Sequence, residues 1–451
     1  ELESDEWIPF GYLRNEEGFY SSESNFRSKL SLEYAGSYRN NFGENFLSTI
    51  SFGGQLFRDR ARAKYVDTQG FAGPGKPLLT SGGAGTDIDD SILSVTTGGF
   101  FAEWILGFQD RLFVTLGGRG DGSSAFGDDF GTQFYPKAAV SWVVSDYDFW
   151  PTDWWDALKV RTAYGESGKA PGVFDKIRTW NPVTGDGDTP GFTPGEIGNE
   201  NVGPERTAEW EFGADASLLN GRLGIEATYY STTTTDALVP VTYPPSQGFL
   251  ASRTENVGEI SGSGYELYVT GVLLQSDAIE WRGRVSYSHN ENEAKDLQGQ
   301  IIAGDNTAEV REGYAVPSYF GSVITNPNAF ADPVVETSAY IGPVNPTDLI
   351  GIGTDFTLFQ NWTVDLLMEY QGGHYLPQYT GYQNGRRGVW YPCYDIQAKI
   401  VAYENGDAGA LNDVTAQERG KCATNAFGGS NSDYWVESAD FWKLRSVSLT
   451  Y

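Results

Sequence analysis

The chain has 451 residues with 14% aromatics, 56 glycines and one methionine, a composition typical of proteins built from strands and turns rather than helices. Its 31 basic and 60 acidic residues give a net charge of −29, which argues against binding nucleic acid through the phosphates. No stretch approaches the roughly 20 apolar residues of a membrane-spanning helix. This does not exclude a membrane β-barrel, because the alternation of apolar and polar residues dilutes the apolar signal of its strands.

The chain begins at Glu1 with an acidic stretch that lacks an initiator methionine, a basic segment and an apolar leader. A mature or truncated exported protein would look like this.

Alternation of apolar and polar residues predicts about 13 strands. In chain order they cover residues 24–36, 45–58, 91–106, 111–121, 132–145, 157–165, 206–218, 222–233, 260–274, 279–291, 350–359, 362–371 and 440–451. Several are long, whereas strands of soluble proteins usually stop near about five or six residues and a tilted membrane strand needs about 9 to 11. Strand length therefore favours a membrane barrel.

The clearest hairpin covers residues 206–230. Trp210 and Phe212 share one parity while Glu209 and Glu211 hold the other, and the alternation continues beyond an Asn220-Gly221 turn. Because successive side chains of a strand point to opposite faces, this pattern predicts a sheet with one apolar and one polar face.

The connections alternate in length. Those at 107–110, 219–221, 275–278 and 360–361 are tight and the one at 146–156 is moderate, whereas the intervening ones are longer at 122–131 and long at 166–205, 234–259, 292–349 and 372–439. A soluble sandwich has no physical reason to sort its loops in this way. Outer-membrane barrels do, because their periplasmic turns are short and their extracellular loops are long.

The charged parity is expected to face the barrel interior. Val160 alternates with Lys159 and Arg161, and Trp281 alternates with Arg282. An Arg or Lys on the lipid face costs roughly 2 to 4 kcal/mol at mid-bilayer, so the charged residues must point into the lumen. Aromatics near strand ends suit the interfacial girdles of a barrel, although in a soluble protein they would be core; they are Trp104, Trp142, Trp150, Trp154, Trp155, Tyr229 and Trp281.

Motifs for catalysis or cofactor binding are few. Residues 165–170 resemble a phosphate loop only superficially, and the two histidines, His289 and His374, are interpreted as ordinary polar strand-end or loop residues. The acidic clusters at 87–90 and 128–129 are interpreted as solvated loop residues rather than calcium ligands. We therefore expect no enzyme activity, no cofactor and no metal site.

The two cysteines, Cys393 and Cys422, lie in one stretch rich in Gly, Asn and Asp. In an oxidising compartment they could pair, and we expect a disulfide within this loop; two free buried thiols are the alternative.

Six segments in a fixed order resemble the SusC/RagA-type TonB-dependent outer-membrane transporters, in their C-terminal barrel portion. They are RLFVTLGGRGDGSSAF at 111–126, FYPKAAVSWVVSD at 134–146, LKVRTAYGESGKAPG at 158–172, IGNENVGPERTAEWEFGADASLLNGRLGIEATYY at 197–230, ENVGEISGSGYELYVTG at 255–271 and YWVESADFWKLRSVSLTY at 434–451.

The resemblance implies an all-β fold, a transmembrane antiparallel β-barrel with long extracellular loops. Barrels of this family have about 22 strands, so residues 1–451 would form part of one outer-membrane barrel domain that does not close alone. The plug and the N-terminal regions of the family are absent from this chain.

The function that the resemblance implies is TonB-dependent import of nutrient oligomers, glycan or peptide fragments, across the outer membrane of a Gram-negative bacterium. The implied partners are a SusD-like surface lipoprotein, the TonB complex through regions missing here, and outer-membrane lipid. A soluble or surface β-rich protein that binds or hydrolyses carbohydrate, or acts in adhesion, is the alternative.

Substrate contact is expected from aromatics in the long loops, because a ring grips a sugar face or a peptide side chain without a particular hydrogen-bond partner. The candidates are Trp180, Phe249, Trp390 and Tyr391. The alternative is that these rings pack the loops against one another or meet the lipoprotein.

Overall fold

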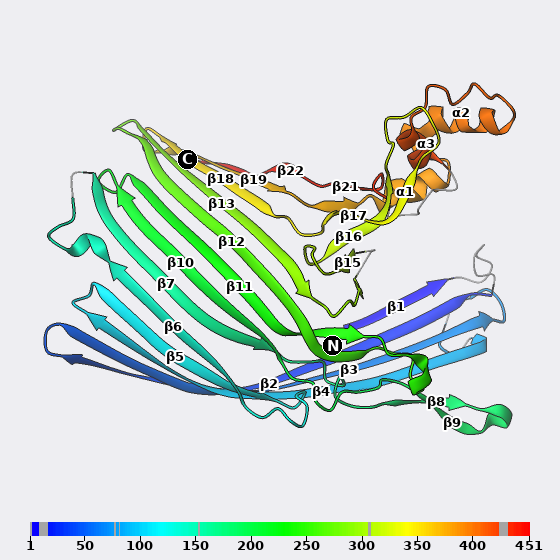
Figure 1. Cartoon of the computed structure of the whole chain (residues 1–451), viewed down its shortest axis with the longest axis horizontal. Coiled ribbons are helices and arrows are strands. Elements are labelled where there is room, and N and C mark those ends of the chain that lie inside the picture. Colours follow the sequence, from blue (N-terminus) through cyan, green and yellow to red (C-terminus); the bar gives the residue numbers. More distant parts are fainter. Residues whose placement is uncertain are drawn as a thin grey trace.

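In the computed structural model the described residues are 2–8, 17–75, 78–80, 82–151, 154–304, 308–423 and 432–451. Their main feature is one curved antiparallel sheet of 14 strands, in which every strand pairs with the next sheet strand along the chain (Figure 1). Its strands are β1 (Leu2–Ile8), β2 (Phe19–Phe42), β3 (Phe46–Phe71), β4 (Gly82–Phe108), β5 (Leu112–Ser123), β6 (Gln133–Val143), β7 (Trp155–Lys169), β10 (Glu205–Leu218), β11 (Leu223–Val241), β12 (Arg253–Gln275), β13 (Ile279–Asp296), β18 (Asp348–Leu358), β19 (Trp362–Gly372) and β22 (Phe441–Thr450).

All of the predicted strands fall on strands of this sheet, and β1 is an additional one at its edge. The first hairpins are longer than predicted, because β2, β3 and β4 have 24, 26 and 27 residues. The sheet has two free edges, at β1 and β22, so the barrel is not closed by this chain.

Short and long connections lie mostly at opposite ends of the sheet, as the alternation of loop lengths predicts (Figure 1). The exception is the connection at 144–154 between β6 and β7, which lies at the short-turn end but is longer than the connection at 124–132 between β5 and β6. The tight turn between β10 and β11 is built from Leu219, Asn220 and Gly221, all with positive φ. Asn and Gly tolerate this left-handed region, which gives the turn the twist of the flanking strands.

The register places the two parities on opposite faces of the sheet. Val160 lies opposite Trp142 on one side and Ala214 on the other, while Lys159 lies opposite Val143 and Asp215. Because the side chains of directly paired residues share a face, the apolar residues of neighbouring strands form one surface and the charged residues form the other.

The long connections contain structure that the loop prediction did not anticipate. Small sheets are formed by β8 (Trp180–Thr184) with β9 (Pro190–Pro194), by β20 (Tyr375–Pro377) with β21 (Val436–Ser438), and by β14 (Ile302–Ala303), β15 (Ala308–Val310), β16 (Ser318–Ile324) and β17 (Val335–Pro343).

The described residues between β20 and β21 form three helices, α1 (Tyr379–Arg386), α2 (Tyr394–Glu404) and α3 (Ala416–Cys422). None of the helices in the described ranges is long and apolar enough to cross a membrane. Cys393, just before α2, and Cys422, at the end of α3, are joined by a disulfide with an S–S distance of 2.04 Å.

The buried cores lie in the connections and at the strand ends that carry them. One cluster contains Tyr434 and Trp435 with Ile324 and Ala416. A second joins the end of β11 to the end of β13 through Val239 and Leu297. The large apolar residues of the main sheet are mostly exposed, which leaves them available to another apolar medium.

Candidate functional site

A cavity of about 490 Å³ lies on the charged face of the sheet. Side chains of this face reach it from β7, β11, β12, β13, β18 and β19, so the face is concave over this span. Its polar lining residues on this face are Arg161, Glu226, Thr228, Glu266, Tyr268, Ser286, Ser288 and Glu369, and Leu349 and Leu367 add apolar surface.

Arg161 links the polar residues along one wall of the cavity. Its guanidinium lies 3.5 Å from Asp215 and 3.8 Å from Glu211, and it donates a hydrogen bond of 2.6 Å to the Thr228 hydroxyl. Asp215 also pairs with Lys159 at 2.8 Å. These contacts hold Arg161 in one orientation, because each of its charged neighbours is itself fixed on a strand.

Glu226 and Glu266 differ from these paired residues. Within the described part of the chain neither carboxylate has a hydrogen bond or an ion pair, although both line the cavity. They project from the adjacent strands β11 and β12, where Glu266 lies opposite Thr228. The cavity therefore presents unoccupied acceptors, suited to a ligand that brings hydroxyl or amide N–H donors.

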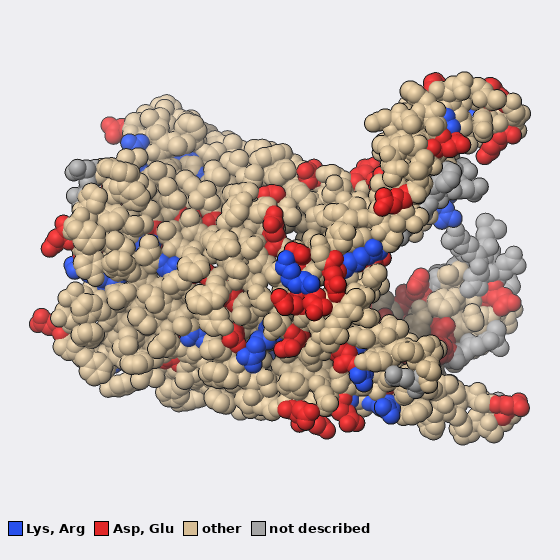
Figure 2. Space-filling view, viewed as in Figure 1, with Lys and Arg blue, Asp and Glu red and all other residues tan. Residues whose placement is uncertain are grey.

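The opposite face of the sheet is apolar and exposed. Trp210 is 51% exposed, and Phe212, Val285, Ile352 and Met368 are exposed as well. Figure 2 shows that charged side chains are sparse over the left half of the view, where strands run to short turns, and gather towards the long connections. An uncharged surface of this extent indicates contact with lipid or another protein.

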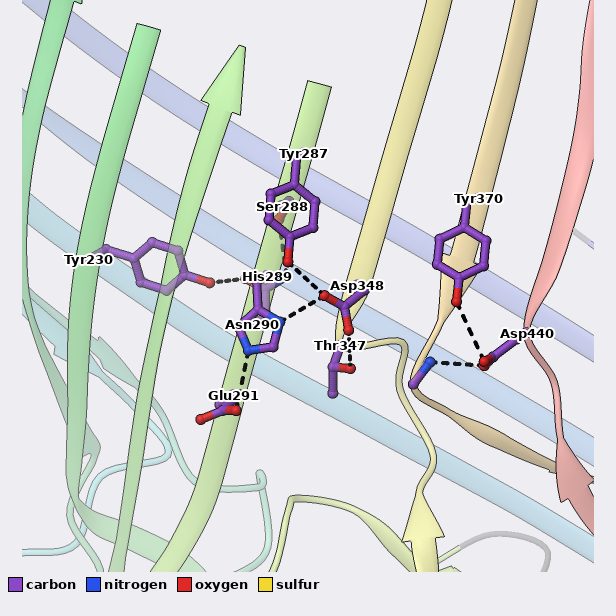
Figure 3. A network of polar contacts seen from close by, with 11 residues as sticks. Tyr230, Tyr287, Ser288, His289, Asn290, Glu291, Thr347, Asp348, Tyr370 and Asp440 are labelled. Atoms are coloured by element: carbon purple, nitrogen blue, oxygen red, sulfur yellow. Dashed lines mark hydrogen bonds and ion pairs between the residues drawn. The ribbon is translucent and has the colours of Figure 1, made fainter. Parts of the chain in front are cut away.

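A hydrogen-bond network lies on the apolar face where that face ends, towards the long connections (Figure 3). His289 Nδ1 is 2.9 Å from Asp348 and its Nε2 is 3.2 Å from Glu291. The Tyr287 hydroxyl donates to the same Asp348 oxygen at 2.9 Å. The network joins residues 287–291 of β13 to Asp348, the first residue of β18. It therefore holds together the two ends of the connection between these strands.

A second tie fixes the connection between β19 and β22 (Figure 3). The Asp440 carboxylate accepts hydrogen bonds from the Gly373 backbone N–H at 2.9 Å and from the Tyr370 hydroxyl at 3.4 Å. Both long connections therefore leave the sheet through polar contacts that hold their two ends together.

Two of the aromatic candidates for substrate contact lie together. Trp180, at the start of β8, has its ring centroid 5.8 Å from that of Phe249, and the Arg178 guanidinium lies 5.4 Å from the Phe249 ring. Phe249 is only 9% exposed, whereas Trp180 is 54% exposed. Phe249 thus supports the ring of Trp180, and Trp180 is the accessible member of the pair.

The other two candidates are neighbours that face different surroundings. Trp390 packs edge-on against Trp435 with ring centroids 6.4 Å apart and belongs to the core beneath the helices. Tyr391 is 81% exposed and contacts Tyr394. In each pair one candidate ring is packed and the other is accessible, and the rings of the first pair come from two different connections, β7 to β10 and β11 to β12.

The cavity residues were not singled out as a site by the sequence. Alternation assigns Glu226 and Arg161 to the charged face, yet nothing in the sequence indicates that β7 and β19 contribute to one cavity. His289 was interpreted as an ordinary strand-end residue, and the network around it depends on β18 lying beside β13. Among the described residues, no group of three or more His, Cys, Asp or Glu is arranged to hold a metal ion.

Comparison with known protein families gives one match over most of the chain. The profile described as "TonB dependent receptor-like, beta-barrel" matches residues 3–410. A TonB-dependent receptor of Formosa agariphila is 29% identical over 305 residues, which are 63% of this chain and 30% of the relative. The TonB-dependent receptor SusC of Bacteroides thetaiotaomicron is 27% identical over 244 residues, 49% of this chain and 24% of SusC.

Among solved structures, the RagAB peptide transporter has a similar fold. The superposition has a TM-score of 0.78 at 17% sequence identity and covers 100% of this chain and 52% of the transporter chain. The chain therefore spans about half the length of that transporter subunit, and its match spans less than a third of the curated relatives.

Proposed function

The chain belongs to the TonB-dependent receptor-like β-barrel family, and from this membership we propose that it forms part of the wall of an importer in the outer membrane of a Gram-negative bacterium. Residues 1–451 would be one portion of a single barrel domain. Strands outside this chain would pair with the free edges at β1 and β22, and a plug outside this chain would fill the lumen.

The observation that carries this proposal is the division of the sheet into two chemically opposite faces. One face exposes apolar side chains, and the other holds the ion pairs of Arg161 and Lys159 and the cavity with the carboxylates of Glu226 and Glu266. In a bilayer the apolar face is stabilised by lipid and the charged face by a wet lumen. A soluble protein would instead bury the apolar face.

The cargo we propose is a nutrient oligomer, a glycan or peptide fragment, and the process is transport rather than catalysis. Glu226 and Glu266 offer acceptors to hydroxyl or amide donors of such a chain, and the exposed rings of Trp180 and Tyr391 would meet it at the outer side. Phe249 would hold the ring of Trp180 in place, and Tyr394 contacts the ring of Tyr391. The RagAB relative of known structure is a peptide transporter, which supports a peptide as one of the two cargo classes.

The partners we propose are a SusD-like surface lipoprotein and the TonB complex. The similarity to SusC and to the RagAB transporter supports the lipoprotein, which would meet the long connections. TonB would act through regions outside this chain, and its energy would move the plug to open the lumen.

The test combines membrane extraction with uptake. Membranes carrying the full-length protein are washed with alkaline carbonate and then extracted with detergent, and we expect release only by detergent. Cells with and without the protein are then given fluorescent oligopeptide or oligosaccharide pools. Loss of uptake of one pool in the deletion strain, and equal loss on removing TonB, are the expected results. Release by carbonate alone would refute membrane embedding, and unchanged uptake of both pools would refute import.

A further inference from the structure

A row of basic residues follows the apolar band on β3. Leu56 is the last large apolar side chain of that band, and the next four residues on its side of the strand are Arg58, Arg60, Arg62 and Lys64. The pairing of β3 with both neighbours runs without a bulge from Phe46 to Gln69, so these side chains share the face of Leu56. We call these four residues the basic row.

The basic row begins where the hydrocarbon of a bilayer would end. Leu56 is ten residues after Phe46 at the short-turn end, since 56 − 46 = 10. At about 3.3 Å per residue and a tilt near 40°, ten residues rise about 25 Å, the height of the apolar band of outer-membrane barrels. The basic row therefore lies at the level of the lipid headgroups on the side of the long connections.

The positive charge of the row is only partly neutralised. Arg62 pairs with Asp90 of β4, and Lys64 lies directly opposite the same carboxylate. Arg58 and Arg60 have no hydrogen bond or ion pair within the described residues. Glu3 of β1 is level with Lys64, two strands away from it. The two uncompensated guanidinium groups are thus the pair nearest the apolar band.

The surroundings of Arg58 and Arg60 supply the other contacts of a lipid headgroup. Arg58 lies between Leu30 and Thr96, and Arg60 lies between Ser28 and Ser94. Guanidinium groups bind phosphate through paired N–H donors, and hydroxyls add further hydrogen bonds. The exposed Leu30 and Leu56 would meet the acyl chains of the same molecule.

We infer that the basic row of β3 binds the phosphate of anionic lipids in the outward leaflet of the membrane. The net charge of −29 repels anions from the molecule as a whole. The four basic side chains that follow one another on one face of β3 attract anions locally. The lipid is favoured over a protein partner because the row continues directly from the apolar band. The inference rests on the membrane placement proposed above.

The test uses the full-length receptor, delipidated in detergent and titrated with phosphatidylglycerol or phosphatidylcholine, with bound lipid counted by native mass spectrometry. The variant R58Q/R60Q/K64Q keeps Arg62, so that Asp90 retains its partner. Each basic residue near an anionic surface contributes about fivefold in binding, so the variant should lose at least about tenfold in affinity for phosphatidylglycerol. Its affinity for phosphatidylcholine should not change.

The matched control is R27Q/K29Q/R39Q, which removes the same charge from β2 on the opposite face of the sheet. We expect this control to keep the anionic lipid, and R58K/R60K to keep it as well. Equal loss in the control and the test variant would mean attraction to net charge and would overturn the inference. Unchanged binding in the test variant would overturn it too.

Further experiments distinguish a lipid site from a site for free anions and from a site for a protein partner. Inorganic phosphate at the lipid concentration should not displace the lipid; full displacement would indicate a site for free anions and refute a lipid site. Loss of the surface lipoprotein from the test variant, with lipid retained, would assign the row to a protein. If R58Q/R60Q/K64Q does not fold, the single variant R60Q is measured in the same way.

Insertion of the protein into the membrane is tested separately, by extraction with carbonate and detergent. If the basic row shows no preference for anionic lipid headgroups, the proposed function therefore still stands.

Discussion

At the scale of single residues, polar side chains at strand ends decide how the long connections leave the sheet. His289 touches Asp348 and Glu291 with its two ring nitrogens, and Asp348 also accepts from Tyr287. Hydrogen bonds to charged groups are worth about 1.5 to 3 kcal/mol each when they are well formed. The network therefore holds the two ends of the connection between β13 and β18 more firmly than the strand pairing alone.

Replacing His289 with alanine should loosen this connection at its base. We expect amide hydrogen exchange at residues 290–296 and 344–348 to accelerate by about tenfold or more, because about 1.4 kcal/mol corresponds to a factor of ten. Hydrogen-exchange mass spectrometry on the detergent-solubilised receptor measures this. Thr357→Val, which removes a hydroxyl contact at the other end of β18, should leave these amides unchanged. Equal exchange in His289→Ala and the wild type would contradict the role of the network.

The accessible rings should contribute to ligand affinity and their packed partners to local stability. Trp180→Ala and Tyr391→Ala should each weaken binding of the transported oligomer by roughly 0.5 to 1.5 kcal/mol, the typical value of an aromatic contact. Trp390→Ala should instead destabilise the helical segment, because Trp390 packs on Trp435. Titration calorimetry and limited proteolysis distinguish the two effects. Tyr403→Ala, an exposed ring outside the candidate set, is the control; a loss of affinity equal to that of Trp180→Ala would remove Trp180 from the site.

At the scale of elements, the connection between β19 and β22 is stabilised as a small helical unit. Its helices bury few residues of their own, and α2 has no fully buried side chain. The unit is fixed by the Tyr434 and Trp435 core and by the disulfide between Cys393 and Cys422. A small unit with a thin core depends on such crosslinks.

Removing the disulfide should unfold the helical unit without affecting the sheet. The cysteines are 29 positions apart, and a closure of that length contributes roughly 3 to 4 kcal/mol in the entropic model. We expect C393S/C422S to be cleaved by trypsin between residues 386 and 421 much faster than the oxidised wild type. The heat-modifiable gel mobility of the barrel should be unchanged. Equal cleavage of both proteins would show that the Trp435 core suffices.

The capping box of α3 gives a prediction with a defined pH dependence. The Thr415 N–H and hydroxyl donate to Glu418 at 2.8 and 2.7 Å, and these contacts lower the pKa of Glu418. The stabilisation is therefore fully present above the ordinary pKa of a glutamate and is lost as the pH falls through the lowered pKa. Thr415→Ala should cost about 1 kcal/mol of local stability at neutral pH.

Amide exchange in α3, measured at neutral pH and near pH 4 and corrected for the intrinsic rate, checks this prediction. Glu418→Gln cannot titrate at this position, so its α3 should show a smaller loss of protection on acidification than the wild type. An identical loss in both proteins would assign the pH dependence to other groups.

At the scale of the whole molecule, the sheet separates two environments. Adjacent residues of one strand face opposite media, as Val285 on the apolar face and Ser286 in the cavity illustrate. The same separation recurs in neighbouring strands, because the register keeps like parities together, and it ends on β3 at Leu56, where the basic row begins on the apolar face. The proposed import would require this division, since the lumen must stay wet while the outside stays in lipid.

Arginine substitutions at two neighbouring positions test this division directly. Val285→Arg should cost roughly 2 to 4 kcal/mol on insertion into a bilayer, whereas Ser286→Arg should insert normally because the lumen is solvated. Insertion into liposomes, followed by heat-modifiable mobility, measures both. The same outcome for both variants would contradict the assignment of the two faces.

The strands of the main sheet from β2 to β22, their facing and the sorting of most loops follow from local patterns in the sequence. These features depend on local rules: a period of two in side-chain direction and the tolerance of Asn220 and Gly221 for a left-handed turn. Residues 206–230 are an example, because the predicted hairpin is observed as the antiparallel pairing of β10 with β11 around Asn220 and Gly221. The extension of β2, β3 and β4 was missed, because polar and basic residues beyond Leu56 break the apolar pattern while the backbone pairing continues.

The places where side chains from distant strands meet depend on the three-dimensional curvature of the sheet. Arg161 and Glu369 reach one cavity because the sheet curves, and curvature accumulates over many strand pairs rather than within one. The helices between β20 and β21 form in a segment whose polar, glycine-rich composition is typical of a loop, and they are fixed by packing on Trp435 and by the disulfide. Contacts of this kind depend on the spatial neighbours of a residue, which alternation along one strand does not encode.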